Sequence, residues 1–322
     1  MHLPENEYIN SANKSIKLIW KMHNIKRNFD KILETIKPFT EDIFNQRGNV
    51  PKPGPVAKMS DLEVIALTLT SEYLSIDSEN YLFKKLRSCH YQDFPQLIDR
   101  SQFNKRKKHL FEYIDKIRQR IADHFIATEN YFIVDSMPVE VAKISRERRS
   151  KICKEVFETS PDKGYCASQK TYFYGYKLHG ICSMSGVFHS FDLTKASVHD
   201  NEILPDLKYQ LSDCVLLGDK GYIGKDVQLD LFHHASIKLE TPMRKNQKEY
   251  RSYPRVFRKT RKRLETLFSQ LSDQFMMKRN YAKSFRGFRT RLLSKIAAMT
   301  AIQFVNYFQL GRNLNNLKHA II

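Results

Sequence analysis

Two short apolar runs in the chain each lead into a single aspartate. Residues 132–134 (Phe-Ile-Val) precede Asp135, and residues 215–217 (Val-Leu-Leu) precede Gly218 and Asp219. Runs of this length and composition are typical of strands that are buried on both faces. An acid delivered to the rim of a sheet is costly unless a cation meets it. The pattern therefore predicts two buried strands whose aspartates share a cation.

The segment between these two strands contains a polar stretch and a predicted hairpin. Residues 143–169 are polar and show no clear period, which predicts a long loop. The two apolar stretches that follow predict strands joined over Ser185 and Gly186. Lys177 and His179 alternate with apolar residues, so they share one face of the first hairpin strand.

The residues that follow the first aspartate strand and those that precede the second have to be assigned to turns, caps or the functional site. Ser136 and Pro138 are expected to end the pairing of the first aspartate strand. His199 and Asp200 begin a short predicted helix, in which Ser197 or Asp200 serves as the N-cap. The alternative is that His199 and Asp200 belong to the functional site, and we favour the cap.

The first third of the chain has apolar residues at helical spacing, interrupted by a proline-rich loop. Ser60 and Glu63 have the spacing of a capping box. A further helix is predicted to begin after an N-cap at Ser101, and its first two turns are basic. Lys105 and Arg106 are the DNA contacts predicted there, and a solvated basic helix face is an equally good interpretation.

A third candidate acid, Glu265, borders the apolar stripe of a predicted amphipathic helix. An ion pair to Arg261, one turn earlier, is the simplest interpretation. Against it, residues 251–322 hold sixteen Lys and Arg and two acids. If the aspartate strands are parallel neighbours, this helix can pack across the sheet end where their acids meet. Oxygen ligands without Cys or His then favour two Mg²⁺ or Mn²⁺ ions about 3.5–4 Å apart over zinc.

Charge narrows the choice of partner. The 322 residues carry a formal charge of +19, of which residues 251–322 account for +14. Such a block is the footprint of a polyanion, and of nucleic acid in particular. The aromatic residues Tyr281, Phe285 and Phe288 lie between the basic ones, where they can stack on bases or dock on the core.

The remaining composition argues for a cytoplasmic protein. No run of 18 apolar residues is present, and the first twenty residues lack the apolar stretch of a signal peptide. The five cysteines are scattered without a CxxC pair, which favours reduced thiols over disulfides or a zinc site. We therefore expect a cytoplasmic protein with no membrane contact.

Four motifs, taken in order, resemble those of the DDE transposases of bacterial insertion sequences, in particular the insertion-sequence nine-eight-two group. They are IVDS around Asp135, YGYKLHG, LLGDKGY around Asp219 and RKRLETLFSQL around Glu265. The resemblance covers about residues 60–310. It implies a ribonuclease H-like α/β domain with a mixed sheet, in which Asp135, Asp219 and Glu265 form the metal-binding catalytic triad. The sequence departs from related transposases at Ser272, where they carry Lys or Arg.

This resemblance predicts a division of the chain. Residues 1–127 are expected to form an all-helical DNA-binding domain, and residues 128–322 a ribonuclease H-like DDE catalytic domain with a basic C-terminal segment. The YGYKLHG strand places Lys177 and His179 near DNA phosphate. The full set of predicted DNA contacts is Lys105, Arg106, Lys177, His179, Arg261, Lys262, Lys278, Arg279, Arg286 and Arg289.

The expected activity is that of a transposase that binds the terminal inverted repeats of its element. It would cut the ends with two Mg²⁺ ions, for which Mn²⁺ can substitute, and join the 3′-hydroxyl to target DNA, as a homodimer on the DNA. Two alternatives stay open at this point. One is a metal-dependent DNA nuclease of the same fold, and the other is a non-enzymatic DNA-binding protein derived from a transposase.

Overall fold

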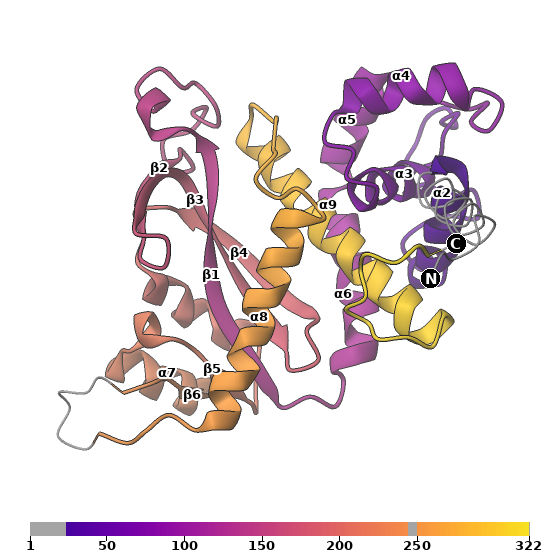
Figure 1. Cartoon of the computed structure of the whole chain (residues 1–322). Helices are drawn as coiled ribbons and strands as arrows, with labels where there is room; N and C mark the ends of the chain where they lie inside the picture. The colour runs from indigo at the N-terminus through magenta and orange to yellow at the C-terminus, as the bar shows by residue number, and fades with distance from the viewer. Residues whose placement is uncertain (1–23, 244–249, 322) are drawn as a thin grey trace, which may run out of the picture. The chain divides into compact units, whose positions relative to one another are not determined.

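The computed structural model describes residues 24–243 and 250–321, which form two compact units (Figure 1). One unit, the sheet unit, runs from Gln119 to Leu292. The other, the helical unit, combines the described residues up to Arg118 with those from Leu293 onward. The sequence predicts that everything after residue 127 goes with the sheet. In the structure the segment from Leu293 onward groups with the N-terminal helices, where Lys295 forms a buried ion pair with Glu72 at 2.5 Å.

The helical unit is built from amphipathic and buried helices. The predicted capping box is confirmed: Ser60 Oγ accepts from the Glu63 amide, and the Glu63 carboxylate accepts from the Ser60 amide. The elements are α2 (Ile25–Ile36), η1 (Lys37–Thr40), α3 (Asp61–Tyr73), α4 (Glu79–Cys89), α5 (Arg100–His109), the start of α6 (Phe111–Ile126), the end of α9 (Phe285–Phe304) and η5 (Val305–Gln309).

The basic helix predicted from Ser101 is in fact two helices. α5 begins after Asp99, which replaces Ser101 as the N-cap and makes no side-chain capping bond. It ends at a buried Leu110, whose amide donates to the Arg106 carbonyl, and α6 starts at the next residue. Hydrophobic spacing continues through this junction, so the pattern alone could not locate the break.

The sheet unit contains a six-stranded mixed sheet with β1 at its centre. β1 pairs antiparallel with β3 on one side and parallel with β5 on the other, and β6 lies parallel beyond β5. β2 and β4 pair with successive parts of β3. The strands are β1 (Tyr131–Ala142), β2 (Asp162–Cys166), β3 (Thr171–Ser183), β4 (Phe188–Lys195), β5 (Val215–Leu217) and β6 (Lys238–Glu240).

Helices flank this sheet, as the predicted α/β class requires, and α8 covers the face that carries Asp135. Gly180 lies opposite Asp135 in the ladder, so both positions point to the same face. A Cβ at Gly180 would approach the Phe268 ring of α8 to 3.2 Å. α8 crosses this face in Figure 1. α8 comprises Arg255–Asp273, and the other flanking elements are η3 (Asp200–Tyr209), η4 (Lys220–Tyr222), α7 (Lys225–Ala235) and the first turns of α9.

The hairpin over Ser185 and Gly186 is confirmed, and two other predictions for this region are wrong. β1 does not stop after Asp135 but continues through Pro138, which lies opposite Lys177. β5 ends opposite Ile133, so the rest of β1 behaves as an edge, where proline is tolerated. The segment expected to be a loop also contains η2 (Ile144–Arg146) and the strand β2, whose five residues (Asp-Lys-Gly-Tyr-Cys) show no apolar alternation.

No helix among the described residues is long and apolar enough to cross a membrane.

Candidate active site

The parallel pairing of β1 and β5 brings the two predicted aspartates to the same end of the sheet. Ile133 of β1 lies opposite Leu217 of β5. Asp135 comes two residues after Ile133, and Asp219 comes two residues after Leu217. Asp135 Oδ1 accepts a hydrogen bond from the Ser136 amide at 2.8 Å. Asp219 Oδ1 accepts from the Gly221 amide at 2.6 Å, as the cap of η4. The adjacency expected from the two apolar runs is therefore present.

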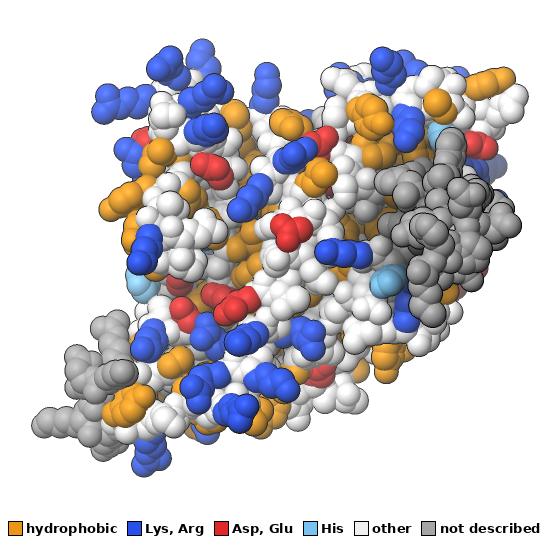
Figure 2. Space-filling model, viewed as in Figure 1, with side chains coloured by type: hydrophobic (Ala, Val, Ile, Leu, Met, Phe, Trp, Pro, Cys, Tyr) orange, Lys and Arg blue, Asp and Glu red, His pale blue; other side chains and the backbone are white. Residues whose placement is uncertain are grey.

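Glu265 reaches the same place from α8. Leu264, Leu267 and Phe268 are buried and fix the helix on the sheet, which leaves Glu265 exposed at the edge of the apolar stripe. One cavity of about 610 Å³ is lined by all three predicted acids. Figure 2 shows acidic side chains gathered beside α8, with Lys and Arg side chains bordering them.

The simpler interpretation of Glu265, an ion pair to Arg261, is not what the structure shows. Arg261 lines the same cavity, and its buried Nε has no hydrogen-bond partner among the described residues. Its positive charge acts on Asp135 instead. The acid and the arginine are therefore separate features of one cavity.

The electrostatics of Asp135 set it apart from an ordinary aspartate. Burial raises its pKa from 3.8 to about 6, and the negative charges of Asp219 and Glu265 push in the same direction. The Ser136 amide and Arg261 oppose this rise. An acid whose ionised form is penalised by burial and by two like charges is stabilised when a cation binds beside it.

The donor set fits a hard divalent cation, since all three predicted ligands supply carboxylate oxygens. Across residues 24–243 and 250–321, however, no three His, Cys, Asp or Glu side chains converge into a ready-made metal site. The acids line one cavity without meeting at one point. Holding an ion would therefore require rotations about side-chain bonds, and one of the two Asp219 oxygens already accepts from the Gly221 amide.

A fourth carboxylate, Asp200, belongs to this cavity and was misjudged from sequence. The cap of η3 is His199, whose Nδ1 accepts from the Asn201 amide at 3.3 Å, and not Asp200 or Ser197. The Asp200 carboxylate instead accepts from Ser136 Oγ at 3.2 Å and from Lys177 Nζ at 3.0 Å. These partners lie 64 and 23 residues away along the chain, so no local pattern could have found them.

The two members of the predicted Lys-x-His pair have different environments. Lys177 lines the cavity, where its Nζ donates to the Val198 carbonyl and to Asp200. His179 is 1 % exposed and shares a 2.8 Å hydrogen bond with Thr194 Oγ1. Burial lowers the pKa of His179 to about 4, so the imidazole is neutral at pH 7. A buried neutral imidazole does not contact a DNA phosphate in this arrangement.

Of the other predicted DNA contacts, some are exposed or line the cavity and one is held by other groups of the protein. In the helical unit Lys105 is exposed, whereas Arg106 is held by the Asp61 carboxylate and the Met59 carbonyl. In the sheet unit Lys278 lines the cavity with Arg261. The remaining predicted contacts are exposed on α8 or near the start of α9, and they are Lys262, Arg279, Arg286 and Arg289.

Two of the three tail aromatics dock on the core. Phe288 is buried, and its ring centroid lies 5.3 Å from that of Tyr176. Phe285 is partly buried and packs on the same tyrosine at 5.6 Å. Tyr281 remains exposed. The docking interpretation therefore holds for Phe288, whose ring is not available to stack on a base.

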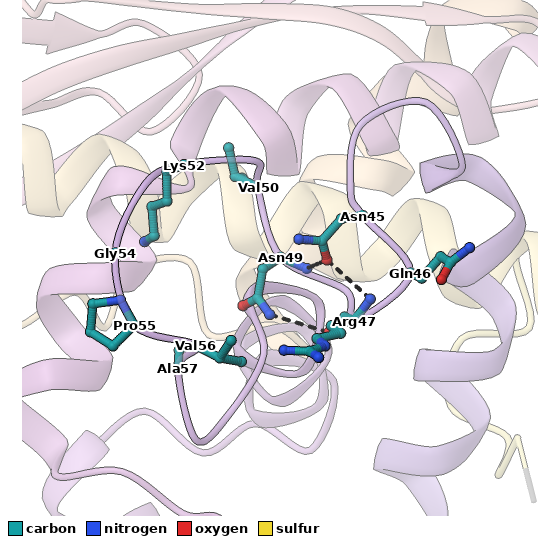
Figure 3. A pocket seen from close by; sticks show the side chains of 10 residues that line it. All are labelled: Asn45, Gln46, Arg47, Asn49, Val50, Lys52, Gly54, Pro55, Val56 and Ala57. Carbon is teal, nitrogen blue, oxygen red and sulfur yellow. Dashed lines mark hydrogen bonds between the residues drawn. The ribbon is translucent and has the colours of Figure 1, made fainter.

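A second cavity, of about 370 Å³, lies within the proline-rich loop of the helical unit (Figure 3). Asn45 Oδ1 accepts from the amides of Arg47 and Asn49 and shapes this loop. Its lining includes Lys52 and Arg47 but no carboxylate, thiol or imidazole. It offers no acid–base or metal chemistry, so we place the candidate active site in the acid-lined cavity of the sheet unit.

Comparison with known families agrees with this placement. A family model described as the transposase DDE domain matches residues 127–301. The matched segment begins just before β1 and includes all three acids, and its mixed sheet with flanking helices is consistent with a ribonuclease H-like DDE domain. No curated protein and no solved structure matches the chain.

Proposed function

The chain belongs to the transposase DDE family, a family of DNA-cutting and DNA-joining enzymes, and from this premise we propose that it is the transposase of a bacterial insertion sequence similar to the nine-eight-two group. The enzyme is a DNA transposase. Its specific reaction would be cleavage at the terminal inverted repeats of its element, followed by transfer of the freed 3′-hydroxyl to target DNA.

The observation that carries this proposal is that three acids from three elements line one cavity. Asp135 comes from β1, Asp219 from the residues after β5, and Glu265 from α8. DDE transposases use divalent metal ions, and we assign these three carboxylates as the ligands of two Mg²⁺ ions. Such ions, when bound, lower the pKa of water and offset negative charge on the phosphodiester.

The protein groups around the acids have distinct roles in this proposal. Arg261 and Lys278 line the cavity and can neutralise phosphates of a strand that enters it. Ser136 and Lys177 are held by Asp200 and so keep a fixed position beside Asp135. His179 supports the strand from inside through Thr194 and makes no DNA contact.

Exposed basic residues outside the cavity would extend the DNA path. On the sheet unit these are Lys262, Arg279, Arg286 and Arg289. We assign repeat binding to the helical unit, in which Lys105 of α5 is exposed, while Arg106 is occupied by Asp61 and serves the fold. Two element ends must be brought together for transfer, so the proposed complex is a homodimer on DNA, acting in the bacterial cytoplasm.

A strand-transfer assay tests the proposal. Purified full-length protein is mixed with Mg²⁺, supercoiled target and DNA carrying the ends of its own element, either intact or pre-cut. We expect cleaved ends and joined products from the wild type and neither from Asp219→Asn. Asp226→Asn, an exposed acid at the start of α7, is the matched control and should behave as the wild type.

The outcomes separate the alternatives. Cleavage without joined product from pre-cut ends would identify a nuclease of the same fold. Binding of the ends without any metal-dependent chemistry would identify a DNA-binding protein derived from a transposase. An Asp219→Asn enzyme that joins ends as well as the wild type would contradict the site assignment itself.

A further inference from the structure

The hairpin formed by β2 and β3 presents two tyrosines to solvent. Tyr165 and Tyr172 lie directly opposite each other in the antiparallel ladder. Their ring centroids are 5.0 Å apart, and the residues are 51 % and 68 % exposed. Single exposed aromatics are common on protein surfaces, but a cross-strand pair concentrates apolar ring surface at one spot. Within residues 24–243 and 250–321, no side chain buries this pair.

The tyrosine pair lies at the edge of the acid-lined cavity. Tyr165 and the residues that follow it, 166–169, line the same cavity as Asp135, Asp219 and Glu265. The turn is tight, since β2 ends at Cys166 and β3 starts at Thr171, and Lys170 takes a left-handed conformation with φ of 51°. β3 in turn pairs with β1, which carries Asp135. The hairpin is therefore a wall of the active-site cavity.

The segment around this wall is basic. Residues 143–170 contain eight Lys and Arg against four acids, and Figure 2 shows Lys and Arg side chains standing out from the loop end of the sheet unit. Lys163 and Lys170 flank the tyrosines in sequence. Positive charge combined with exposed aromatic rings is the arrangement by which proteins hold unpaired nucleotides, because charge attracts the phosphates and rings stack on the bases.

We propose that Tyr165 and Tyr172 form a stacking platform for an unpaired base of the DNA strand that enters the acid-lined cavity. This inference rests on the proposed function, since it assigns the strand's path at the same site. A base that leaves the duplex next to the cut site exposes its ring face, and the tyrosines offer a matching surface at low entropic cost. The platform would hold the strand while the acids act on its phosphodiester.

The test measures binding by the full-length protein without divalent metal, so that no DNA is cut. The probes are a 20-nucleotide single strand carrying 2-aminopurine and a blunt duplex of the same sequence. The test variant is Tyr165→Ala/Tyr172→Ala, and its conservative partner is Tyr165→Phe/Tyr172→Phe, which keeps both rings. Tyr209→Ala, at a residue of η3 that is 81 % exposed, is the matched control.

We expect the double alanine variant to bind the single strand about tenfold more weakly than the wild type, with little change for the duplex. The quenching of 2-aminopurine should be lost with it. The double phenylalanine variant and Tyr209→Ala should match the wild type in both measurements. Because the tyrosines are exposed, circular dichroism and thermal melting should show all variants folded.

Three results would overturn the platform. They are unchanged single-strand affinity in the double alanine variant, an equal loss for single strand and duplex, and a change of oligomeric state on sedimentation, which would make the tyrosines a contact between copies of the chain. Failure of the proposed function is visible separately. A protein that shows tyrosine-dependent binding but never joins element ends would support the stacking platform and contradict the proposed transposase function. A protein that joins element ends without tyrosine-dependent binding would support the function and contradict the platform.

Discussion

Clustered acids occur in both units of the molecule, but their negative charges are compensated in different ways. In the helical unit Glu72 faces Lys295 and Asp61 faces Arg106, both at 2.5 Å, and Glu79 faces Lys107. In the sheet unit Asp135, Asp219 and Glu265 share one cavity, and none of them forms an ion pair with a Lys, Arg or His of the described residues. The first set is complete within the chain, whereas the second set has room for a cation from outside.

This difference separates acids that stabilise the fold from acids to which we assign the reaction. A buried ion pair is destabilising when one partner is removed, because the other charge is left without compensation. Carboxylates that repel one another gain stability when one of them is neutralised. Substitutions in the helical unit should therefore lower stability, whereas substitutions of the three cavity acids should lower activity without lowering stability.

The largest expected effect is on activity. Asp219→Asn should reduce cleavage of element ends by on the order of 10³-fold or more, because one of the three proposed charged ligands is lost. Binding of the ends, measured by gel shift, should be unchanged. Loss of binding in parallel with activity would mean that Asp219 supports the fold and not the chemistry.

The next effect is on stability, and its sign differs between the two units. Glu72→Gln should lower the free energy of unfolding by about 3–5 kcal/mol, because Lys295 stays buried without its partner. Asp135→Asn should be neutral or stabilising in metal-free buffer, since it removes a buried charge beside two like charges. Urea unfolding of both variants measures the two values, and equal losses would contradict the distinction.

A pH dependence of stability should accompany Asp135. Its pKa in the folded state, about 6, lies above the ordinary value of 3.8, so the folded state holds this proton more tightly than the unfolded chain. Its contribution should be most favourable below pH 4 and should fall as the pH rises from about 4 to 6, by up to about 3 kcal/mol. The difference in stability between the wild type and Asp135→Asn, followed by urea unfolding across this range, isolates the effect. A constant difference would contradict it.

The smallest expected effect concerns Asp200, which resembles the acids of the helical unit because it has a cation of the chain beside it. Asp200→Asn should lower the rate of strand transfer about tenfold, since Lys177 loses a charged hydrogen-bond partner. Asp200→Asn and Lys177→Met should be non-additive in a double-mutant cycle. If their effects simply add, Asp200 acts independently of Lys177.

The sequence predicts those features whose defining residues lie next to one another along the chain. The two apolar runs placed Asp135 and Asp219 correctly because each strand and its acid are contiguous, and two parallel strands bring their ends together. The amphipathic stripe placed Glu265 at the edge of a packed helix. The α/β class and the transposase assignment followed from these short segments and their order.

What the sequence could not predict depends on distant partners. Asp200 could be placed in the cavity only once Ser136 and Lys177 were known to reach it. The basic pattern around Arg106 predicts a DNA contact, but its guanidinium is held by Asp61, which lies 45 residues earlier in the chain. The strand β2 has no apolar alternation of its own and exists because β3 offers an edge. Each miss is a case in which tertiary contacts override the local pattern.

Metal binding tests the central claim most directly. Mn²⁺ is titrated into the full-length protein bound to a DNA end, and bound ion is followed by electron paramagnetic resonance. We expect saturable Mn²⁺ binding in the wild type and in Asp226→Asn, and loss of this binding in Asp135→Asn and Asp219→Asn. Equal Mn²⁺ binding by all four proteins would contradict the assignment of these carboxylates as the metal site.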